Sequence, residues 1–570
     1  MKNIILLSIF TLIAIYIGFF AFDKNELFFI YSNSVYYFIS VIFFIWFYLA
    51  VMLFIKNKKK FLVFISNHKL PLIVSSSIVI LFLFICPPEY RILADEVNLL
   101  GTSKSLFEKH NVFFSLEEIN MLENKQHIAF SMDKRLVLFP YVLNLVHSLK
   151  GYSTNNAFII NFFASIGCLF LLYYFIQRLW GKYYGLIALL FLASYPLFIR
   201  YSMSAGYDVF CLFCAFLSFV FFCRFCKFNS FQNANLLIYS VALLSYTRYE
   251  CSVMAIIIMI ATLIMINKKE LDKIHYSFCI YPLLFVPNAW IMFFANTNTY
   301  LQVTQGERVF ALDYLPGNIS DAFYFFLEFD SNQESVLIIA LLAIFSIFFL
   351  VRKLLTSKNE IITIINKYKY HLFILSSFLF IQIIIKFSYK YGDLLIDQNA
   401  RFGMTCLPYI IFLAVYFIKC ILQKRINYKP IVLLLVIFTL LQYWAKTQNN
   451  FYAKGSTSSY KIFKNFQEFL EGNFKDKNDL ILASDYSNFL TPLKYNSISI
   501  ETLNKNFSTI KTYIEEKKYW NKLIVIQVLE NGKYEKESVV NGSKDFEVIY
   551  EKAITDNSTI RYSVYKSLKQ

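Results

Sequence analysis

Apolar runs of about 20 residues recur along most of this chain, and this repetition constrains its fold more than any other feature. Of the 570 residues, 57% are hydrophobic and only 16% are charged. A helical run of this length matches the hydrocarbon thickness of a bilayer, and a soluble domain cannot bury so many such runs. The sequence therefore predicts a polytopic α-helical membrane protein.

Thirteen apolar segments are candidate membrane spans. They are residues 3–22, 34–55, 70–87, 154–177, 184–200, 207–223, 234–247, 251–266, 276–295, 336–351, 370–387, 402–418 and 429–445. The composition then becomes charged, with β-type runs at 479–484, 522–530 and 560–568 and helical runs at 458–471 and 501–518. We therefore expect about 13 transmembrane helices followed by a small soluble α/β domain.

Four regions follow from this pattern. They are N-terminal transmembrane helices at 1–87, a first outer loop with amphipathic or juxtamembrane helices at 88–153, a transmembrane core at 154–447 with an outer loop at 296–335, and an extracytoplasmic α/β domain at 448–570.

Basic residues predict the orientation of these regions. With the N-terminus in the cytoplasm, 21 Lys and Arg residues fall in short inner loops, as the positive-inside rule requires. The odd number of spans then places the C-terminal domain outside. The formal net charge of +17 has the same origin, so the sequence gives no reason to expect a nucleic-acid partner. The expected location is a bacterial inner membrane, crossed many times.

The first long polar segment, residues 88–135, follows the third apolar run. Four apolar residues between 93 and 107 are spaced for one helical face, so we expect a helix that begins near Ala94 and lies along the membrane interface. Asp95 and Glu96 would lie in its first turn. One interpretation is that they only complement the helix dipole. The other is that this acidic pair, next to a span on the outer face, takes part in catalysis.

Several segments resemble the C-type glycosyltransferase superfamily, which includes the protein O-mannosyltransferases and the aminoarabinose transferase of lipid A. They are ILADEVNLLGTSKSLFEK, DKRLVLFPYVLNLVHSLKGYSTNNAFIINFFASIG, YYGLIALLFLASYPLFIRYSMSAGYDVFCLFCAFLSFVFFCRF, LLSYTRYE and ARFGMTCLPYIIFLA. The likeness covers roughly residues 80–445. Two features depart from the family pattern: two spans precede the usual first one, and the Lys-Pro-Pro-Leu run is reduced to Lys134-Arg135-Leu136.

The resemblance implies inverting transfer of a sugar from a polyprenyl-phosphate donor in the membrane lipid to an acceptor whose identity the sequence does not reveal. A carboxylate must accept the proton of the attacking acceptor. By its match to the family's acidic pair, Asp95 is the candidate base, with Glu96 as its neighbour. Asp208, at the start of a later span, is the second acidic candidate. A charge that only complements the start of its helix is the alternative for Asp208.

Cationic groups or a divalent metal must stabilise the leaving phosphate. The candidates for donor binding are Arg401, Arg248, Lys134 and Arg135, with snorkelling to the membrane interface as the alternative for each. Glu250 is expected to pair with Arg248. No clear set of metal ligands stands out in the sequence, so we expect no metal site and leave the cofactor unknown.

Cys211 and Cys214 have CxxC spacing, but a lipid-embedded helix is a poor place for a metal site or a redox pair. We therefore expect them to act as small hydrophobic residues.

Two rival functions stay open: a transporter or flippase, and an O-antigen polymerase or ligase. A transporter would place ionisable groups at mid-membrane depth, whereas these acids gather at the outer ends of spans.

Overall fold

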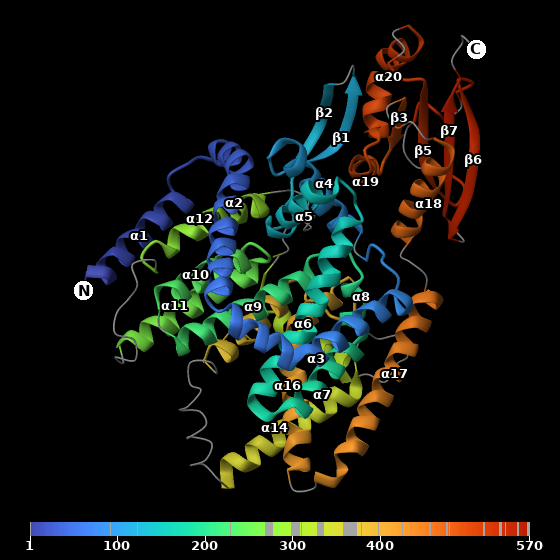
Figure 1. The fold of residues 1–570 in the computed structure, drawn as a ribbon. Helices are drawn as coiled ribbons and strands as arrows, with labels where there is room; N and C mark the ends of the chain where they lie inside the picture. Colours follow the sequence, from blue (N-terminus) through green and yellow to red (C-terminus); the bar gives the residue numbers. More distant parts are fainter. Residues whose placement is uncertain are drawn as a thin grey trace. The chain divides into compact units, whose positions relative to one another are not determined.

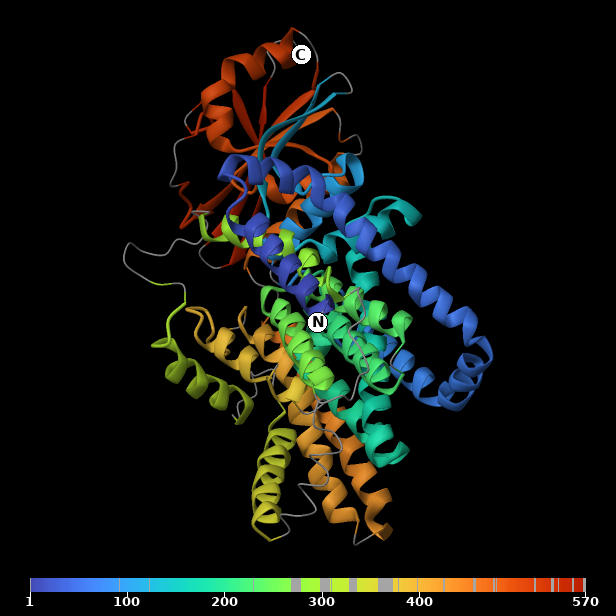
Figure 2. The ribbon, with the colours of Figure 1, turned by 90° about the vertical axis from the view of Figure 1, so that its left-hand side faces the viewer.

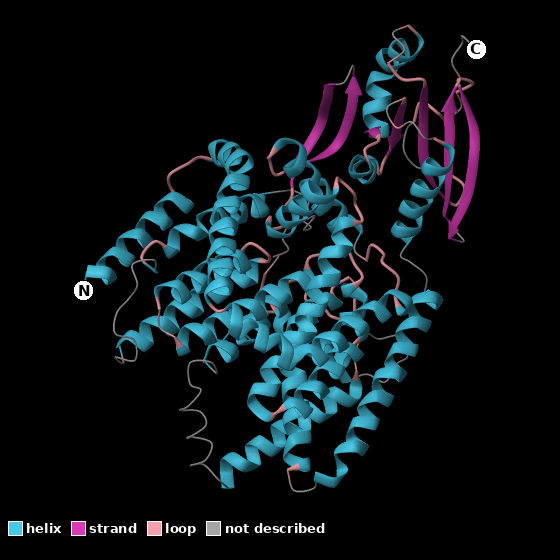
Figure 3. Ribbon diagram, viewed as in Figure 1, coloured by secondary structure: helices cyan, strands magenta, loops and turns pink. Residues whose placement is uncertain are grey.

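The protein is described by a computed structural model. It covers residues 2–91, 93–121, 124–228, 230–267, 278–297, 308, 310–327, 336–356, 373–377, 379–396, 398–423, 426–454, 458–474, 477, 479–516, 519–534, 538–541, 543–555 and 558–566. The chain divides into two compact units. Unit 1 comprises Met1–Glu89, Lys134–Phe139 and Ala157–Lys454, and unit 2 comprises Tyr90–Asp133, Pro140–Asn156 and Gly455–Gln570. Figure 3 shows helices throughout unit 1 and the sheet in unit 2.

Unit 1 is built from helices, most of which coincide with the apolar runs; the helix Tyr314–Leu327 lies in the predicted outer loop at 296–335 instead. They are α1 (Lys2–Phe19), α2 (Lys24–Lys56), α3 (Lys58–Ile85), α6 (Asn156–Trp180), α7 (Lys182–Ser194), α8 (Pro196–Ser202), α9 (Asp208–Lys227), α10 (Phe231–Ser245), η1 (Tyr249–Cys251), α11 (Ser252–Asn267), η3 (Tyr281–Phe285), α12 (Val286–Thr297), α13 (Tyr314–Leu327), α14 (Leu337–Thr356), η4 (Ala400–Cys406), α16 (Leu407–Leu422), η5 (Ile426–Tyr428) and α17 (Lys429–Lys454). A further apolar helix runs over Phe373–Phe387. Figures 1 and 2 show them from two perpendicular directions, with α14 beside α16.

Every predicted span overlaps helical residues, and the prediction of a polytopic helical membrane protein is confirmed. Among the described residues, seven helices are long and apolar enough to cross a membrane, or eight if α7 and α8 form one broken span. The number thirteen stays a prediction. Parts of the predicted spans at 276–295 and 370–387, and much of the predicted outer loop at 296–335, lie outside the described residues.

The predicted span at 184–200 is a bent pair of helices. α7 and α8 meet at 72°, because Pro196 begins α8 and has no N–H with which to continue the ladder of α7. The last carbonyls of α7 therefore need donors from elsewhere. Trp444 of α17 supplies one, since its indole N–H donates to the carbonyl of Ala193 over 2.9 Å.

Unit 2 is an α/β fold around one sheet of seven strands in the order β2-β1-β4-β3-β5-β7-β6. The strands are β1 (Phe113–Met121), β2 (Asn124–Met132), β3 (Leu480–Ser484), β4 (Asn496–Ile498), β5 (Lys522–Glu530), β6 (Phe546–Thr555) and β7 (Ser558–Tyr565). The helices are α4 (Leu93–Lys109), α5 (Leu138–Lys150), α18 (Ser458–Asn473), α19 (Ser487–Leu490) and α20 (Ile500–Glu515), with η6 (Thr491–Leu493). β3 pairs in parallel with β4 and β5, and the other pairings are antiparallel.

Helices cover both faces of this sheet. On one face, Leu503 and Ile510 of α20 share a buried core with Leu523 and Val525 of β5. On the other, Phe469 of α18 packs against β7, with its ring centroid 4.0 Å from that of Tyr562. Alternate residues of a strand point to opposite faces, and β5 carries buried apolar side chains on both of its faces.

The hairpin β1–β2 was not predicted from the sequence, although α4 and α5 occupy the places where helices were expected. It joins the sheet through Glu118, which pairs with Ser497 of β4. Two side-chain contacts fasten it further: Thr491 donates to the carbonyl of Ser115 over 2.9 Å, and Thr502 donates to the carboxylate of Glu117 over 3.0 Å. The segment predicted as the first outer loop and the C-terminal tail therefore belong to one folded unit.

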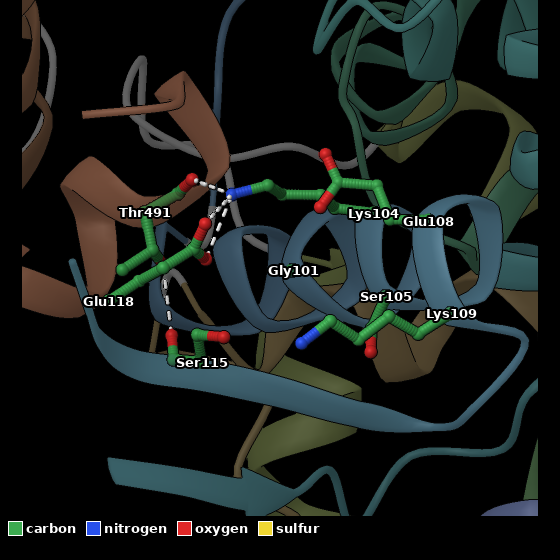
Figure 4. A pocket seen from close by; sticks show the side chains of 8 residues that line it. All are labelled: Gly101, Lys104, Ser105, Glu108, Lys109, Ser115, Glu118 and Thr491. Atoms are coloured by element: carbon green, nitrogen blue, oxygen red, sulfur yellow. Dashed lines mark hydrogen bonds and ion pairs between the residues drawn. The ribbon is translucent and has the colours of Figure 1, made fainter. Parts of the chain in front are cut away.

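Lys104 and Glu118 form a buried ion pair at this junction (Figure 4). The ammonium of Lys104 on α4 lies 3.0 Å from the carboxylate of Glu118 and donates to the carbonyl of Thr491 over 2.8 Å. The two side chains are 5% and 6% exposed. Each charge therefore relies on the other, because neither has access to water.

Removing one charge should destabilise unit 2 strongly. We expect Lys104→Met to lower its free energy of unfolding by about 3–5 kcal/mol, because Glu118 keeps a buried charge without its partner. Hydrogen exchange of the β5 amides, followed by mass spectrometry, measures this stability.

Two further variants test the cause of that loss. Adding Glu118→Leu to Lys104→Met should restore much of the protection, since no lone charge remains. Lys505→Met is the matched control, because its pair with Glu501 is 70% and 76% exposed, and water screens such pairs so that they contribute little to stability. Equal losses in Lys104→Met and Lys505→Met would contradict the interpretation.

Candidate functional site

Asp208 is the first residue of α9, and α6 fixes the turn that leads into it. The side-chain amide of Asn161 donates to the carbonyls of Ser204 and Gly206 over 2.8 and 2.5 Å. Asn161 is fully buried and Asp208 is only 3% exposed. A carboxylate at this depth needs a cationic partner, because burying an unpaired charge is very unfavourable.

Arg248 is that partner. Its guanidinium pairs with the carboxylates of both Asp208 and Glu250, with 2.6 Å between Nε and Oε1 of Glu250. The pairing with Glu250 was predicted, whereas the pairing with Asp208 depends on the fold. Asn288 of α12 steadies the preceding helix end by donating to the carbonyl of Ser245 over 3.2 Å.

Lys386 brings a second cation, from the end of the helix Phe373–Phe387. Its ammonium lies 3.7 Å from the carboxylate of Glu250. It also donates to the hydroxyl of Thr405 over 2.6 Å and to the carbonyl of Phe402 over 3.0 Å. These contacts join the turn after α10 to η4, which carries Arg401.

We call Asp208, Arg248, Glu250 and Lys386 the ion cluster. All four are at least 90% buried, and their formal charges sum to zero. Two acids and two bases can share a buried site because each charge has an opposite partner. The cluster is thus neutral overall. Its ion pairs hold together the start of α9, the turn after α10 and the end of the helix Phe373–Phe387.

Two of the predicted donor-binding arginines meet at one aromatic ring. The guanidinium carbons of Arg248 and Arg401 lie 5.3 and 5.4 Å from the ring centroid of Phe402. Arg248 also lies 5.4 Å from the ring centroid of Tyr207. Arg401 is half-buried, unlike Arg248. Arg401 is therefore the better placed of the two to meet a ligand.

Lys134 and Arg135 are half-buried and belong to the same unit. The hydroxyl of Tyr249 donates to the carbonyl of Lys134. The N–H of Leu138 donates to the carbonyl of Tyr246 over 3.0 Å. These bonds hold the segment that carries both basic residues beside the turn that carries Arg248.

Asp95 and Glu96 belong to unit 2, in the first turn of α4. Glu96 is 1% exposed, and its carboxylate accepts a hydrogen bond from the backbone N–H of Arg91 over 2.7 Å. Asp95 is half-buried. The two neighbours therefore differ. Glu96 is buried and binds a backbone N–H just before the helix, whereas Asp95 is partly exposed at the surface.

His147 is also buried in unit 2, and its surroundings keep it neutral. Asn156 donates to Nδ1 over 2.9 Å, and Nε2 lies 3.3 Å from the hydroxyl oxygen of Ser103. Burial, together with the nearby charge of Lys494, lowers the pKa of His147 to about 4. Within the part of the chain that the structure describes, no group of three or more His, Cys, Asp or Glu residues is placed to hold a metal ion.

Sequence analysis overlooked Lys386 and Phe402. A lysine inside the predicted span at 370–387 was an available signal, because ionisable residues in such spans usually have a partner and a function. Phe402 offered no signal, since one phenylalanine among 64 in the chain does not stand out.

A model of the family described as dolichyl-phosphate-mannose-protein mannosyltransferase matches residues 134–291 of this chain. This range contains Lys134, Arg135 and three members of the ion cluster. No curated protein matches the sequence.

Three solved structures are similar in fold. ArnT from Cupriavidus metallidurans bound to undecaprenyl phosphate has a TM-score of 0.49 and 9% identity, covering 87% of this chain and 98% of its own. The apo form of ArnT has a TM-score of 0.42 and 8% identity with the same coverage. The arabinosyltransferase EmbB from Mycobacterium smegmatis has a TM-score of 0.36 and 12% identity, covering 60% of this chain and 30% of its own.

All three TM-scores lie below 0.5, so no argument is based on these structures. The assignment of the chain to a class of enzyme is based on the family match. It covers residues 134–291, which is part of the stretch of roughly 80–445 in which the resemblance to the C-type superfamily was recognised from the sequence. The match confirms that resemblance, and with it the prediction that this chain is a membrane glycosyltransferase that uses a lipid-linked sugar donor.

Proposed function

We propose that the protein transfers a sugar from a polyprenyl-phosphate donor to an acceptor at the outer face of the membrane, with inversion at the anomeric carbon. The observation that carries this proposal is the ion cluster, together with the meeting of Arg248 and Arg401 at Phe402. This arrangement lies at the ends of apolar helices, where the phosphate of a membrane-anchored donor would be found.

The proposed roles of Arg248 and Arg401 differ because the two side chains differ in burial. Arg248 is already balanced by two carboxylates, so we assign it to positioning, with Asp208 and Glu250 as the groups that hold it. Arg401 is half-buried and contacts the same aromatic ring. We propose that Arg401 binds the phosphate and stabilises the negative charge that develops as the sugar–phosphate bond breaks. Lys134 and Arg135 would add positive charge to the same region.

Asp95 is the proposed general base. It would accept the proton of the acceptor as the acceptor attacks the anomeric carbon opposite the leaving phosphate, which inverts the configuration. The difference in burial supports Asp95 over Glu96, because the carboxylate of Glu96 is used inside unit 2 by the backbone of Arg91.

The sheet of unit 2 supports the proposed orientation. Its strands come from residues 113–132 and from residues 480–565, so both parts of the chain must lie on the same side of the membrane. An even number of crossings must therefore separate them, and the predicted spans from 154 to 445 number ten. The excess of basic residues in the other loops then supports an outer position for unit 2.

Labelling of single introduced cysteines tests this orientation. In intact cells, we expect a membrane-impermeant maleimide to label Lys505→Cys, on the exposed side of α20, but not Lys59→Cys, at the start of α3. Lys59→Cys should react only after the membrane is opened. The wild-type protein gives the background from native cysteines. The reverse pattern would place unit 2 in the cytoplasm.

A transporter or flippase is the second candidate, since the ion cluster places four charged residues inside the helical unit. Their positions along the helices argue for surface chemistry instead. Asp208 begins α9, Arg248 lies between α10 and η1, and Lys386 is the penultimate residue of its helix. Mid-membrane charges would be expected for a translocation pathway.

Loss of the Arg401 guanidinium should impair transfer. We expect Arg401→Ala to lower the rate by a factor of roughly 10 to 1000, since charge-assisted contacts to a developing anion are removed. The assay follows labelled sugar from a panel of polyprenyl-phosphate donors into the acceptors of isolated membranes. Arg352→Ala is the control, because Arg352 is an exposed arginine at the end of α14. If Arg401→Ala transfers sugar at the rate of Arg352→Ala, Arg401 has only an interfacial role.

Asp95→Asn tests the proposed base. The change keeps the size of the side chain and removes its ability to take a proton, so we expect the transfer rate to fall by about 10²–10⁴-fold. If Asp95 only complements the helix dipole, the same change costs about 0.3–1 kcal/mol of local stability and hardly alters turnover.

Glu96→Gln is the matched control for Asp95→Asn. Glutamine can still accept the hydrogen bond from Arg91, so this variant should keep much more activity. Hydrogen exchange of α4 in both variants separates catalysis from folding. Normal transfer by both variants, with α4 intact, would show that the base lies elsewhere.

A further inference from the structure

Cys211 and Cys251 bring their sulfur atoms within 3.3 Å of each other in unit 1. Each residue is 1% exposed, and both are free thiols. The S–S bond of a disulfide is roughly 2.05 Å long, so the two sulfurs would need to approach by only about 1.3 Å to become bonded. The hydroxyl of Thr247 also donates to the sulfur of Cys211, over 3.2 Å.

The two thiols lie on the segments that the ion cluster joins. Cys211 follows Asp208 by one turn of α9, and Cys251 directly follows Glu250 in η1. Arg248 pairs with both of these acids. A bond between the sulfurs would therefore connect the same two segments covalently, across 40 positions of sequence.

The structure changes the interpretation of the CxxC spacing. Cys211 and Cys214 are close in sequence, but the partner that the structure gives to Cys211 is Cys251 on a different element. Cys214 is less buried than either of them. It therefore provides a matched control on the same helix.

We propose that Cys211 and Cys251 are a redox pair whose disulfide locks the ion cluster. The oxidant is a small disulfide. One protein thiolate attacks it to form a mixed disulfide and releases one thiol; the second protein thiolate then attacks the protein sulfur and displaces the other thiol. Two electrons and two protons pass from the protein to the oxidant, and one S–S bond is exchanged for another.

Burial controls the rate of this exchange. With both thiols 1% exposed, the oxidant reaches them only when α9 and η1 separate locally. Once formed, the bond is shielded from reductants in the same way. The oxidised protein should also melt at a higher temperature, since closing a loop of this length restricts the unfolded chain.

The test uses the full-length protein purified in detergent under reducing conditions. It is incubated with hydroxyethyl disulfide at temperatures up to its melting point, so that local opening occurs. The protein is then unfolded in SDS, alkylated with N-ethylmaleimide, and digested without reductant for mass spectrometry. We expect a cross-linked peptide pair that contains Cys211 and Cys251, reversed by dithiothreitol, and a rise of several degrees in the melting temperature of the oxidised protein.

Control variants make the outcome decisive and independent of glycosyl transfer. Cys214→Ser should form the same cross-link, whereas Cys211→Ser and Cys251→Ser should not. Cys211→Ala and Cys251→Ala repeat the test without a new hydroxyl in the core. A link between Cys211 and Cys214 would overturn the proposal. Full alkylation of Cys211 and Cys251 in the oxidised wild-type protein would overturn it as well.

Discussion

The pairing of Arg248 with Asp208 and Glu250 is the interaction on which the helical unit depends most. A buried arginine is tolerated only with compensating charge, and its two partners come from α9 and from η1. Lys386 pairs with Glu250 as well, so a third segment of the chain must also reach the cluster. Because each ion needs the others, the ends of these helices must arrive together. A packed apolar core alone would tolerate more than one register.

The same reasoning explains how neighbouring polar contacts serve the cluster. Asn161 holds the turn before Asp208, and Asn288 holds the helix end before Arg248. Each of these amides is buried and donates to a backbone carbonyl that water cannot reach. They fix the backbone on either side of the ion pair, so the charges occupy one geometry. A preorganised geometry of this kind lets fixed charges act on a reacting phosphate without rearrangement.

The sheet of unit 2 sets a second constraint, this time on topology. β1 and β2 come from residues 113–132, while the other five strands come from the C-terminal tail. The buried pair of Lys104 and Glu118 lies at the junction and contacts the carbonyl of Thr491. The loop therefore cannot complete its fold until the tail has been made. Asp95 lies on α4 of this unit, so its position depends on both parts of the chain.

The sequence predicted what local patterns determine. Apolar runs located the helices of unit 1, and short β-type apolar runs within the charged C-terminal segment located β3, β5 and β7. The hairpin β1–β2 shows no such pattern, since EEINMLENKQH is largely polar, and its link to the rest of the sheet pairs Glu118 with Ser497, almost 400 positions away. The pairing of Arg248 with Glu250 was predicted at a separation of two residues, and its pairing with Asp208 was not. Local sequence can identify a charge that needs a partner, but only the fold selects the partner.

Burial also distinguishes residues that look equivalent in the sequence. Asp95 and Glu96 are adjacent, equally charged and in the same helical turn, yet Glu96 is enclosed with a backbone N–H and Asp95 reaches the surface. Arg248 and Arg401 contact the same ring, yet the first is balanced by two acids within the core and the second is half-buried. In each pair, one residue holds the structure and its neighbour can meet a ligand. The roles proposed for Asp95 and Arg401 require this combination, because a group that binds substrate must be accessible before the substrate arrives, while the groups that position it must not move.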